Sequence, residues 1–344
     1  MHGGDIYNRK IEYDFSVNLN PYMPTENIKD AIAKSSNMID NYPDYRCEEL
    51  VTKLSNTLDV DRNFIVLTNG ASEGIVTSIR AIKPDTGVIF EPAFSGYERA
   101  LKALETPNIC HISSYEDGDD NYSNGVCINS NLSVFFLASP SNPDGIQLAR
   151  EEIKEIYSKV NQSNNYLILD ECFINLSDDR NATMIEEIKK YPDYYDHLIV
   201  LRSFTKTFSI PGIRLGYVVS SNTVLLKKIK DNLPEWNIST PAMMAGIVCL
   251  DSQYKLDINN IKIEREYISS ELRNLDIYVV PSNSVYILFK ARDDLYELLL
   301  KKGILIRDCS DYYGLSKGYY RVAVKKHNDN EKLIHEIKSI YGVD

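Results

Sequence analysis

Between residues 64 and 203, the hydrophobic positions of this chain fall in short continuous runs instead of alternating with polar positions. Such runs predict strands buried on both faces, and we expect them at 64–68, 87–91, 108–112, 133–139, 166–170 and 198–203. Between most of these runs the apolar residues return with helical spacing, which predicts helices at 71–82, 94–105, 149–160 and 182–190. Strands separated by helices indicate an α/β fold whose parallel sheet is covered by helices on both faces.

After about residue 250 the pattern changes to a mixture of helices and isolated strands. In order along the chain, it predicts a helix at 256–274, strands at 277–281 and 284–291, a helix at 293–301, strands at 304–308 and 319–325, and a helix at 329–341. This order is typical of a smaller α+β domain. We therefore expect an amino-terminal arm over 1–37 that packs with the small domain, a large domain over 38–255, and a small domain over 256–344.

Composition and charge narrow the class of protein. The 344 residues are 43% hydrophobic and 25% charged, which is typical of a globular protein. A net charge of −11 argues against general binding to nucleic acids or anionic membranes. No apolar run approaches the ~20 residues that cross a bilayer, and the opening MHGGDIYNRK has no apolar leader. The six cysteines form no C-x-x-C pair and the five histidines are scattered, so we expect a cytoplasmic protein without a metal site.

Polar residues follow the predicted strands at the points where ligands of parallel sheets bind. The stretch Asn69-Gly70-Ala71-Ser72 lies at a strand-to-helix turn, where free amides and the helix dipole favour an anion. On its own, this stretch is equally typical of a structural turn. Asn142 follows the strand at 133–139, ahead of a proline-glycine turn.

The next two strands end in charged residues. Asp170 ends the run YLILD and Glu171 follows it, and a carboxylate there is costly unless a cation lies close to it. Lys206 follows LIVLRS, and Arg214 comes after a proline-glycine turn. A lysine so close to a buried strand indicates a charged partner or a chemical role.

Taken in order, the motifs N-G-A-S, N-P-x-G, D-E, [ST]-K and R-L-G-Y over residues 69–217 resemble those of the fold type I pyridoxal-phosphate (PLP) enzymes. The resemblance is to the class I/II aminotransferases around histidinol-phosphate aminotransferase. It implies PLP as cofactor and a large domain with a mostly parallel seven-stranded sheet, accompanied by a smaller α+β domain.

The resemblance also implies roles for individual residues. Lys206 is expected to form the internal aldimine and to shuttle protons, and Asp170 to pair with the pyridinium nitrogen. Asn142 is expected to bind the cofactor's phenolic oxygen, and Phe94 to lie on the ring face unless it is a core residue. The residues expected around the cofactor phosphate are Gly70, Ala71, Ser72, Ser203 and Arg214.

Other expected contacts come from the small domain, the arm and a second subunit. Arg321 matches the arginine that binds the substrate's α-carboxylate, and Arg307 matches one that binds a distal phosphate in phosphate-recognising members. The residues expected to contact substrate from the arm are His2, Gly3 and Asn20. Tyr42, in NYPDY, matches a tyrosine that reaches the phosphate of the neighbouring subunit, which implies a homodimer with shared active sites.

One branch of the family fits the whole chain best. MHGGD, YDFSVNLNP, DECF and RSFTKTFSIPGIRLGY resemble the threonine-phosphate decarboxylases of cobalamin biosynthesis. This implies conversion of L-threonine O-3-phosphate to (R)-1-aminopropan-2-yl phosphate through an aldimine and a quinonoid. Phe173 replaces the aminotransferase tyrosine, whose hydroxyl it cannot supply. Asp5 replaces the branch's asparagine and would repel a phosphate unless it faces away.

Three alternatives stay open at the level of sequence. L-Serine O-phosphate differs from the threonine compound by one methyl group, which is worth only ~1–3 kcal/mol of discrimination. An aminotransferase acting on a phosphorylated substrate such as histidinol phosphate would carry the same motifs. A PLP-binding regulatory module without turnover is the third alternative, although the acidic charge of the chain does not favour DNA binding.

Overall fold

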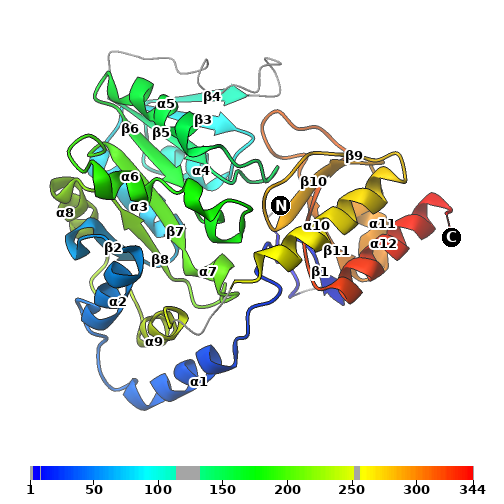
Figure 1. Cartoon of the computed structure of the whole chain (residues 1–344), viewed down its shortest axis with the longest axis horizontal. Helices are drawn as coiled ribbons and strands as arrows, with labels where there is room; N and C mark the ends of the chain where they lie inside the picture. The colour runs from blue at the N-terminus through cyan, green and yellow to red at the C-terminus, as the bar shows by residue number, and fades with distance from the viewer. Residues whose placement is uncertain (1–2, 8, 114–131, 252–255, 344) are drawn as a thin grey trace.

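The computed structural model describes residues 3–7, 9–113, 132–251 and 256–343. A seven-stranded sheet forms the centre of the large domain (Figure 1). Its strands, in spatial order, are β2 (Ile65–Thr68), β8 (Gly216–Val219), β7 (Leu198–Ser203), β6 (Tyr166–Asp170), β5 (Ser133–Ala138), β3 (Thr86–Glu91) and β4 (Asn108–Ser113). The pairs from β7 to β4 are parallel, which confirms the expected fold class.

Strand β8 is the one strand of this sheet that the hydrophobic pattern did not indicate. It is antiparallel to both of its neighbours, β2 and β7. Only four residues long, it follows the turn that carries Arg214, and no crossover helix of the usual kind separates it from β7. A chain that reverses through a short connection returns antiparallel, whereas parallel strands need a long crossover.

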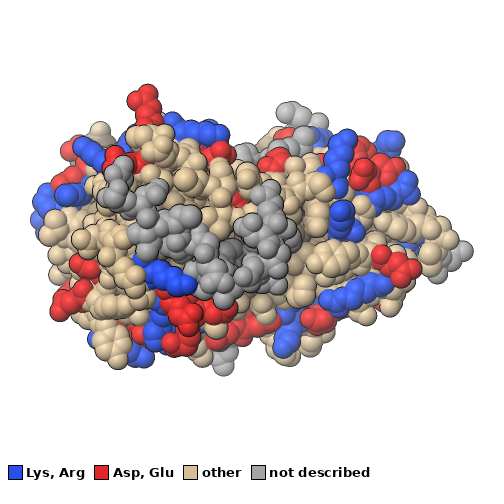
Figure 2. All heavy atoms as spheres, turned by 90° about the horizontal axis from the view of Figure 1, so that it is seen from above, with Lys and Arg blue, Asp and Glu red and all other residues tan. Residues whose placement is uncertain are grey.

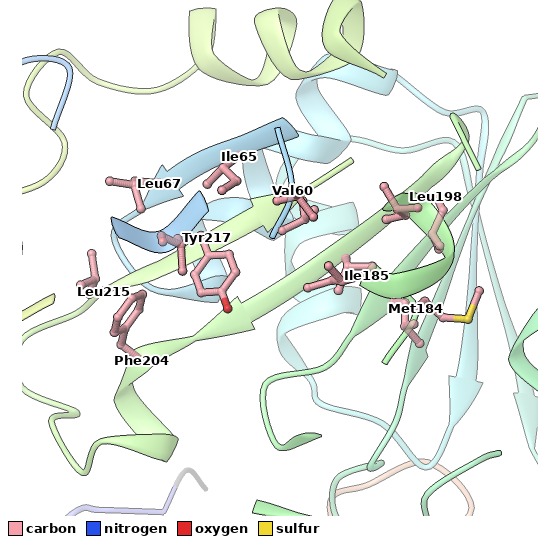
Figure 3. Packing of buried hydrophobic residues seen from close by; sticks show 14 of the residues in the cluster. Val60, Ile65, Leu67, Met184, Ile185, Leu198, Phe204, Leu215 and Tyr217 are labelled. Carbon is pink, nitrogen blue, oxygen red and sulfur yellow. The ribbon is translucent and has the colours of Figure 1, made fainter. Parts of the chain in front are cut away.

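Helices cover both faces of the sheet, as continuous apolar strands require. The helices on one face are α3 (Ala71–Ile82), α4 (Gly96–Ala103) and α8 (Thr223–Asp231). Those on the other are α2 (Glu48–Leu58), α5 (Arg150–Asn161), α6 (Ile185–Lys190) and α9 (Thr240–Cys249). Neighbouring residues of a strand point to opposite faces of the sheet: Val200 packs with the core under α2, α5, α6 and α9, and Leu201 packs with the core under α3, α4 and α8. Figure 3 shows part of the core on the face that α2, α5, α6 and α9 cover.

The small domain is built on an antiparallel sheet. Its strand order is β12 (Arg307–Asp308), β13 (Tyr319–Ala323), β10 (Tyr286–Lys290) and β9 (Tyr278–Val279). Its helices are α10 (Ile258–Arg273), α11 (Leu295–Lys301) and α12 (His327–Tyr341). The predicted strand at 304–308 is in fact two strands, because Ile304–Leu305 (β11) pairs with the arm and Arg307–Asp308 pairs with β13.

The amino-terminal arm contacts both domains. Strand β1 (Tyr13–Asp14) pairs in parallel with β11 of the small domain. Helix α1 (Glu26–Ser35) packs against α9 of the large domain, below the rest of the molecule in Figure 1. Phe15, fully buried, belongs to the core of the small domain. The boundaries at 37/38 and 255/256 stay a prediction.

The surface and the helices are consistent with an acidic globular chain. Figure 2 shows lysine and arginine side chains interspersed with aspartate and glutamate over the face it presents. Within the described ranges, none of the helices has both the length and the apolar character needed to cross a bilayer.

Asp144, in the turn after β5, is a buried carboxyl group. Its Oδ1 accepts hydrogen bonds from the Ser141 hydroxyl and from the Ile146 N–H at 3.0 Å. Its Oδ2 is also buried and has no hydrogen-bond partner among the described residues. Burial raises the pKa of Asp144 to about 7, because the charged form loses its hydration.

This raised pKa predicts how stability depends on pH. The folded state holds the Asp144 proton more tightly than the unfolded state, so its contribution is present at low pH and is lost as pH rises from about 4 to about 7. Compared with D144N, the wild-type free energy of unfolding should fall by roughly 1 kcal/mol per pH unit in that window. Denaturant unfolding of both proteins across the window measures the difference. A constant difference would mean that Asp144 titrates normally.

Candidate active site

A cavity of about 270 Å³ lies at the carboxyl ends of the central strands, where the large domain, the arm and the small domain meet. This is the expected location for a ligand of a parallel sheet. The predicted site residues that line it are Gly3, Ala71, Ser72, Phe94, Asn142, Asp170, Ser203, Lys206, Arg214, Arg307 and Arg321. The fold thus brings together residues that are more than three hundred positions apart in the sequence, such as Gly3 and Arg321.

One end of the cavity is built to hold an anion. Gly70 has a φ of +79° and precedes the first turn of α3, where Ala71 and Ser72 line the cavity. A Cβ on Gly70 would lie 2.5 Å from Nη2 of Arg214, so the glycine lets this guanidinium lie against the helix amino terminus. Helix amides, the helix dipole and an arginine together form a phosphate site.

Two hydroxyl groups extend this anion site. The Ser203 and Thr205 hydroxyl oxygens lie 2.5 Å apart, and both residues line the cavity. Ser203 also accepts a hydrogen bond from the Thr205 N–H at 3.2 Å, which caps the short helix α7 (Phe204–Thr207). Thr205 was not among the predicted phosphate contacts.

The adjacent carboxylates Asp170 and Glu171 serve different purposes. Glu171 is 1% exposed and pairs with Arg202, whose Nε donates to Oε2 at 2.8 Å. Asp170 instead faces the cavity, where Oδ1 accepts from the Cys172 N–H at 2.9 Å and Oδ2 from the Tyr97 hydroxyl at 2.7 Å. The buried ion pair therefore belongs to the framework, and Asp170 is the carboxylate offered to a ligand.

Lys206 lies in helix α7, one turn beyond the end of β7, and not at the strand end itself. The helix is anchored by the buried ring of Phe204, which packs edge-on against Tyr217 at 5.7 Å between centroids, as Figure 3 shows. Desolvation lowers the pKa of the Lys206 amine, and the nearby cations Arg321 and Arg214 act in the same direction. A lowered pKa increases the fraction of neutral amine available as a nucleophile.

The small domain contributes a pair of arginines to the cavity wall. Arg307 on β12 and Arg321 on β13 are direct cross-strand partners, and each is 6% exposed. Nη1 and Nη2 of Arg321 donate to Asn142 Oδ1 and, at 2.8 Å, to the Ser16 carbonyl, while its Nε is buried without a partner among the described residues. Nη2 of Arg307 donates to Asp311 Oδ1 at 2.8 Å.

Asn20, which was expected to contact substrate, makes its side-chain hydrogen bonds within the protein. Its Nδ2 donates to the Thr207 carbonyl at 3.1 Å, its Oδ1 accepts from the Tyr22 N–H at 3.0 Å, and it does not line the cavity. Asn18 lines the cavity instead: it is 3% exposed, and its Oδ1 has no hydrogen-bond partner among the described residues. Asn20 therefore holds the segment that carries Lys206, and Asn18 offers its amide to a ligand.

We expect N18A and N20A to separate these two roles. N18A should lower kcat/KM by about tenfold, the value of one hydrogen bond, and leave stability almost unchanged. N20A should cost about 1–3 kcal/mol of stability, because it leaves the buried Thr207 carbonyl unpaired. Steady-state kinetics and denaturant unfolding of both variants measure this. An exchange of the two phenotypes would reverse the assignment.

Of the other residues considered from the sequence, Tyr42 and Asp5 do not line the cavity. Tyr42 is 79% exposed and stacks on Trp236 at 4.4 Å, away from the cavity of its own chain. His2 lies outside the described residues. The Asp5 carboxylate lies 3.5 Å from Nη2 of Arg9 and does not line the cavity, which removes the expected repulsion of a phosphate there.

Phe173 and Gly3 show how side-chain size shapes the cavity. Phe173 lines it with a ring that packs against Tyr286 at 4.9 Å, and the Lys206 amine lies 6.0 Å from the ring centroid. Gly3 is tightly packed, since a Cβ there would lie 2.4 Å from the Ser16 carbonyl oxygen. The tip of the arm is thereby held next to the carbonyl that binds Arg321.

The residues present fit PLP. An anion site at a helix amino terminus, a lysine with a lowered pKa and a carboxylate, all lining one cavity, match the phosphate, the aldehyde and the ring nitrogen of this cofactor. Fold and site together define a PLP-dependent enzyme of fold type I.

Comparison with known proteins identifies the family. The sequence profile described as aminotransferase class I and II matches residues 10–337, so the chain belongs to this family. It is 31% identical to the threonine-phosphate decarboxylase of Salmonella typhimurium, over 95% of this chain and 90% of that protein. It is 32% identical to histidinol-phosphate aminotransferase 2 of Archaeoglobus fulgidus, over 95% of this chain and 92% of that protein.

A solved structure of similar fold contains the cofactor that fits this site. The histidinol-phosphate aminotransferase from Sinorhizobium meliloti, solved in complex with pyridoxal-5'-phosphate, superposes with a TM-score of 0.83 at 18% identity, over 97% of this chain and 92% of that chain. At this identity the likeness concerns the fold. With the family assignment, it identifies PLP as the cofactor of this chain.

Proposed function

We propose that this chain decarboxylates an O-phosphorylated hydroxy-amino acid, with L-threonine O-3-phosphate as the first candidate and L-serine O-phosphate as the second. The observation that carries the proposal is the cross-strand pair of Arg307 and Arg321 in the cavity that also holds Lys206. Directly paired residues have Cβ atoms about 5 Å apart. Two guanidinium groups so close together suit a substrate with a carboxylate and a phosphate separated by few atoms.

Each residue has a defined task in this proposal. PLP supplies an electron sink for the bond that breaks at Cα. Arg321, fixed by Asn142 and the Ser16 carbonyl, holds the α-carboxylate through its remaining donors. Arg307 binds the phosphate and Asn18 offers an amide oxygen. Lys206, which lines the same cavity, would return a proton to Cα.

The choice between decarboxylation and transamination depends on which Cα bond stands perpendicular to the cofactor ring. Arg321 and the arm, which meet at Ser16, would fix the position of the substrate carboxylate and so influence which bond is broken. Phe173 supplies no hydroxyl group to the cofactor, unlike the tyrosine expected of an aminotransferase. A histidinol-phosphate-type aminotransferase is the second candidate, because the Archaeoglobus fulgidus relative is as similar as the Salmonella typhimurium decarboxylase.

The test is to mix the PLP-loaded protein with O-phospho-L-threonine and to follow both CO₂ and the cofactor's absorption. Catalytic CO₂ with full recovery of the starting spectrum supports the decarboxylase. Repeating the assay with O-phospho-L-serine then ranks the two substrates. Conversion of the cofactor to pyridoxamine phosphate with histidinol phosphate, without CO₂ from either amino acid, would favour the aminotransferase.

We also propose that the enzyme is a homodimer in which Tyr42 reaches the partner's cofactor phosphate. Tyr42, Tyr45 and Trp236 form an exposed aromatic cluster, and Ile39 nearby in sequence is 79% exposed. Such a cluster of large apolar side chains is typical of an interface. Sedimentation of wild type and of the double variant Y42A/I39S tests this, and a wild-type monomer would refute it.

The five free cysteines within the described residues suit a reducing compartment such as the cytoplasm.

A further inference from the structure

Tyr97, which the sequence analysis did not single out, lies directly behind Asp170. It belongs to α4, is 1% exposed, and lines the cavity. Its ring stacks on Phe136 at 5.0 Å and meets Phe94 edge-on at 5.7 Å. These contacts fix the ring, and with it the hydroxyl group that donates to Asp170 Oδ2 at 2.7 Å.

The hydrogen bond from Tyr97 completes the setting of Asp170. The other oxygen, Oδ1, accepts from the Cys172 N–H at 2.9 Å, so both carboxylate oxygens accept a hydrogen bond from the described part of the chain. Burial and the Asp170 charge raise the pKa of Tyr97 well above its usual value. The phenol therefore keeps its proton and serves Asp170 only as a donor.

We propose that Tyr97 is a positioning residue that sets the orientation and the basicity of Asp170 toward the ring nitrogen of PLP. The inference rests on the role proposed above for Asp170. A carboxylate with a donor on each oxygen is a weaker base than one with a single donor, and its plane is fixed. Asp170 then leaves the proton on the ring nitrogen instead of removing it.

This role predicts an effect of Y97F on the bound cofactor. Phenylalanine keeps the ring that packs on Phe136 and Phe94 but leaves Oδ2 without its donor. The more basic Asp170 would draw the proton away from the ring nitrogen, so the ring would carry less positive charge. Because of this, the Lys206 nitrogen that is bonded to the cofactor would hold its own proton more tightly. The pH midpoint of the visible absorption change should therefore rise, by on the order of half a unit.

The experiment is a spectroscopic pH titration of PLP-loaded wild type and Y97F, together with their affinity for PLP. A third protein carries 3-fluorotyrosine at position 97 only. Its phenol is more acidic and donates more strongly, so the midpoint should move in the opposite direction. This variant keeps every contact of the ring, so it decides the question even if Y97F folds poorly. An unchanged midpoint in both proteins, or shifts in the same direction, would overturn the inference.

Two controls assign the effect to Asp170. Y157F removes another buried hydroxyl, which donates to the Tyr194 carbonyl at 2.7 Å, and should leave the midpoint unchanged. In a D170N background, Y97F should cause no further shift. If D170N alone leaves the midpoint unchanged, the role proposed for Asp170 fails. If D170N shifts it and Y97F does not, only the inference about Tyr97 fails.

Discussion

K206A should lower the rate of turnover by on the order of 10³-fold or more, because it removes both the nucleophile and the proton carrier. Desolvation, with two nearby arginines, lowers the pKa of the Lys206 amine, and no other lysine lines the cavity among the described residues. Reduction with borohydride should fix PLP covalently to the wild type and not to K206A, as mass spectrometry of the whole protein would show. The reaction should be assayed with O-phospho-L-threonine.

The matched control is K227A, which removes an exposed lysine that pairs with Asp231 on α8. It should keep both turnover and the covalent adduct. Added methylamine should restore part of the activity of K206A, because a small amine can enter the cavity and carry the proton. Full covalent labelling of K206A would place the cofactor on a different lysine and contradict the assignment.

R321K should lower kcat/KM for O-phospho-L-threonine by roughly 10²-fold, because lysine keeps the charge but loses the paired donors of a buried guanidinium. Arg321 donates to Asn142 and to the Ser16 carbonyl, and its Nε has no hydrogen-bond partner in the described part of the chain. A lysine cannot satisfy the framework and the substrate together. R307K should have an effect of similar size on phosphorylated ligands.

The amino-alcohol phosphate product distinguishes the roles of Arg321 and Arg307, because it has a phosphate but no carboxylate. R321K should weaken the substrate and leave inhibition by this product nearly unchanged, whereas R307K should weaken both. R292K, at an exposed arginine paired with Asp294, is the matched control and should behave as wild type. Equal losses for both ligands in both variants would mean that the two arginines share one anion, as a histidinol-phosphate enzyme would require.

The sequence alone determined the class of fold and most of the site. Continuous apolar runs required strands buried on both faces, and the structure places helices on both sides of the sheet. The order of the motifs led to Lys206, Asp170, Asn142 and Arg214, and the family resemblance of the small domain led to Arg321; all five line one cavity. These features are local in sequence, because a strand end and the turn that follows it carry the chemistry of such folds.

The tertiary structure decided everything that depends on contacts between distant segments. Tyr97 and Asp170 are separated by 73 positions, and no periodicity in the sequence connects them. The register that sets Arg307 against Arg321 arises only when β12 pairs with β13. Asn18 lines the cavity and Asn20 does not. The sequence could not distinguish them, because this part of the arm is neither helix nor strand and has no period of two or 3.6 residues that would indicate which side chain points inward. Local patterns specify elements, whereas the partner of each polar side chain is set by packing.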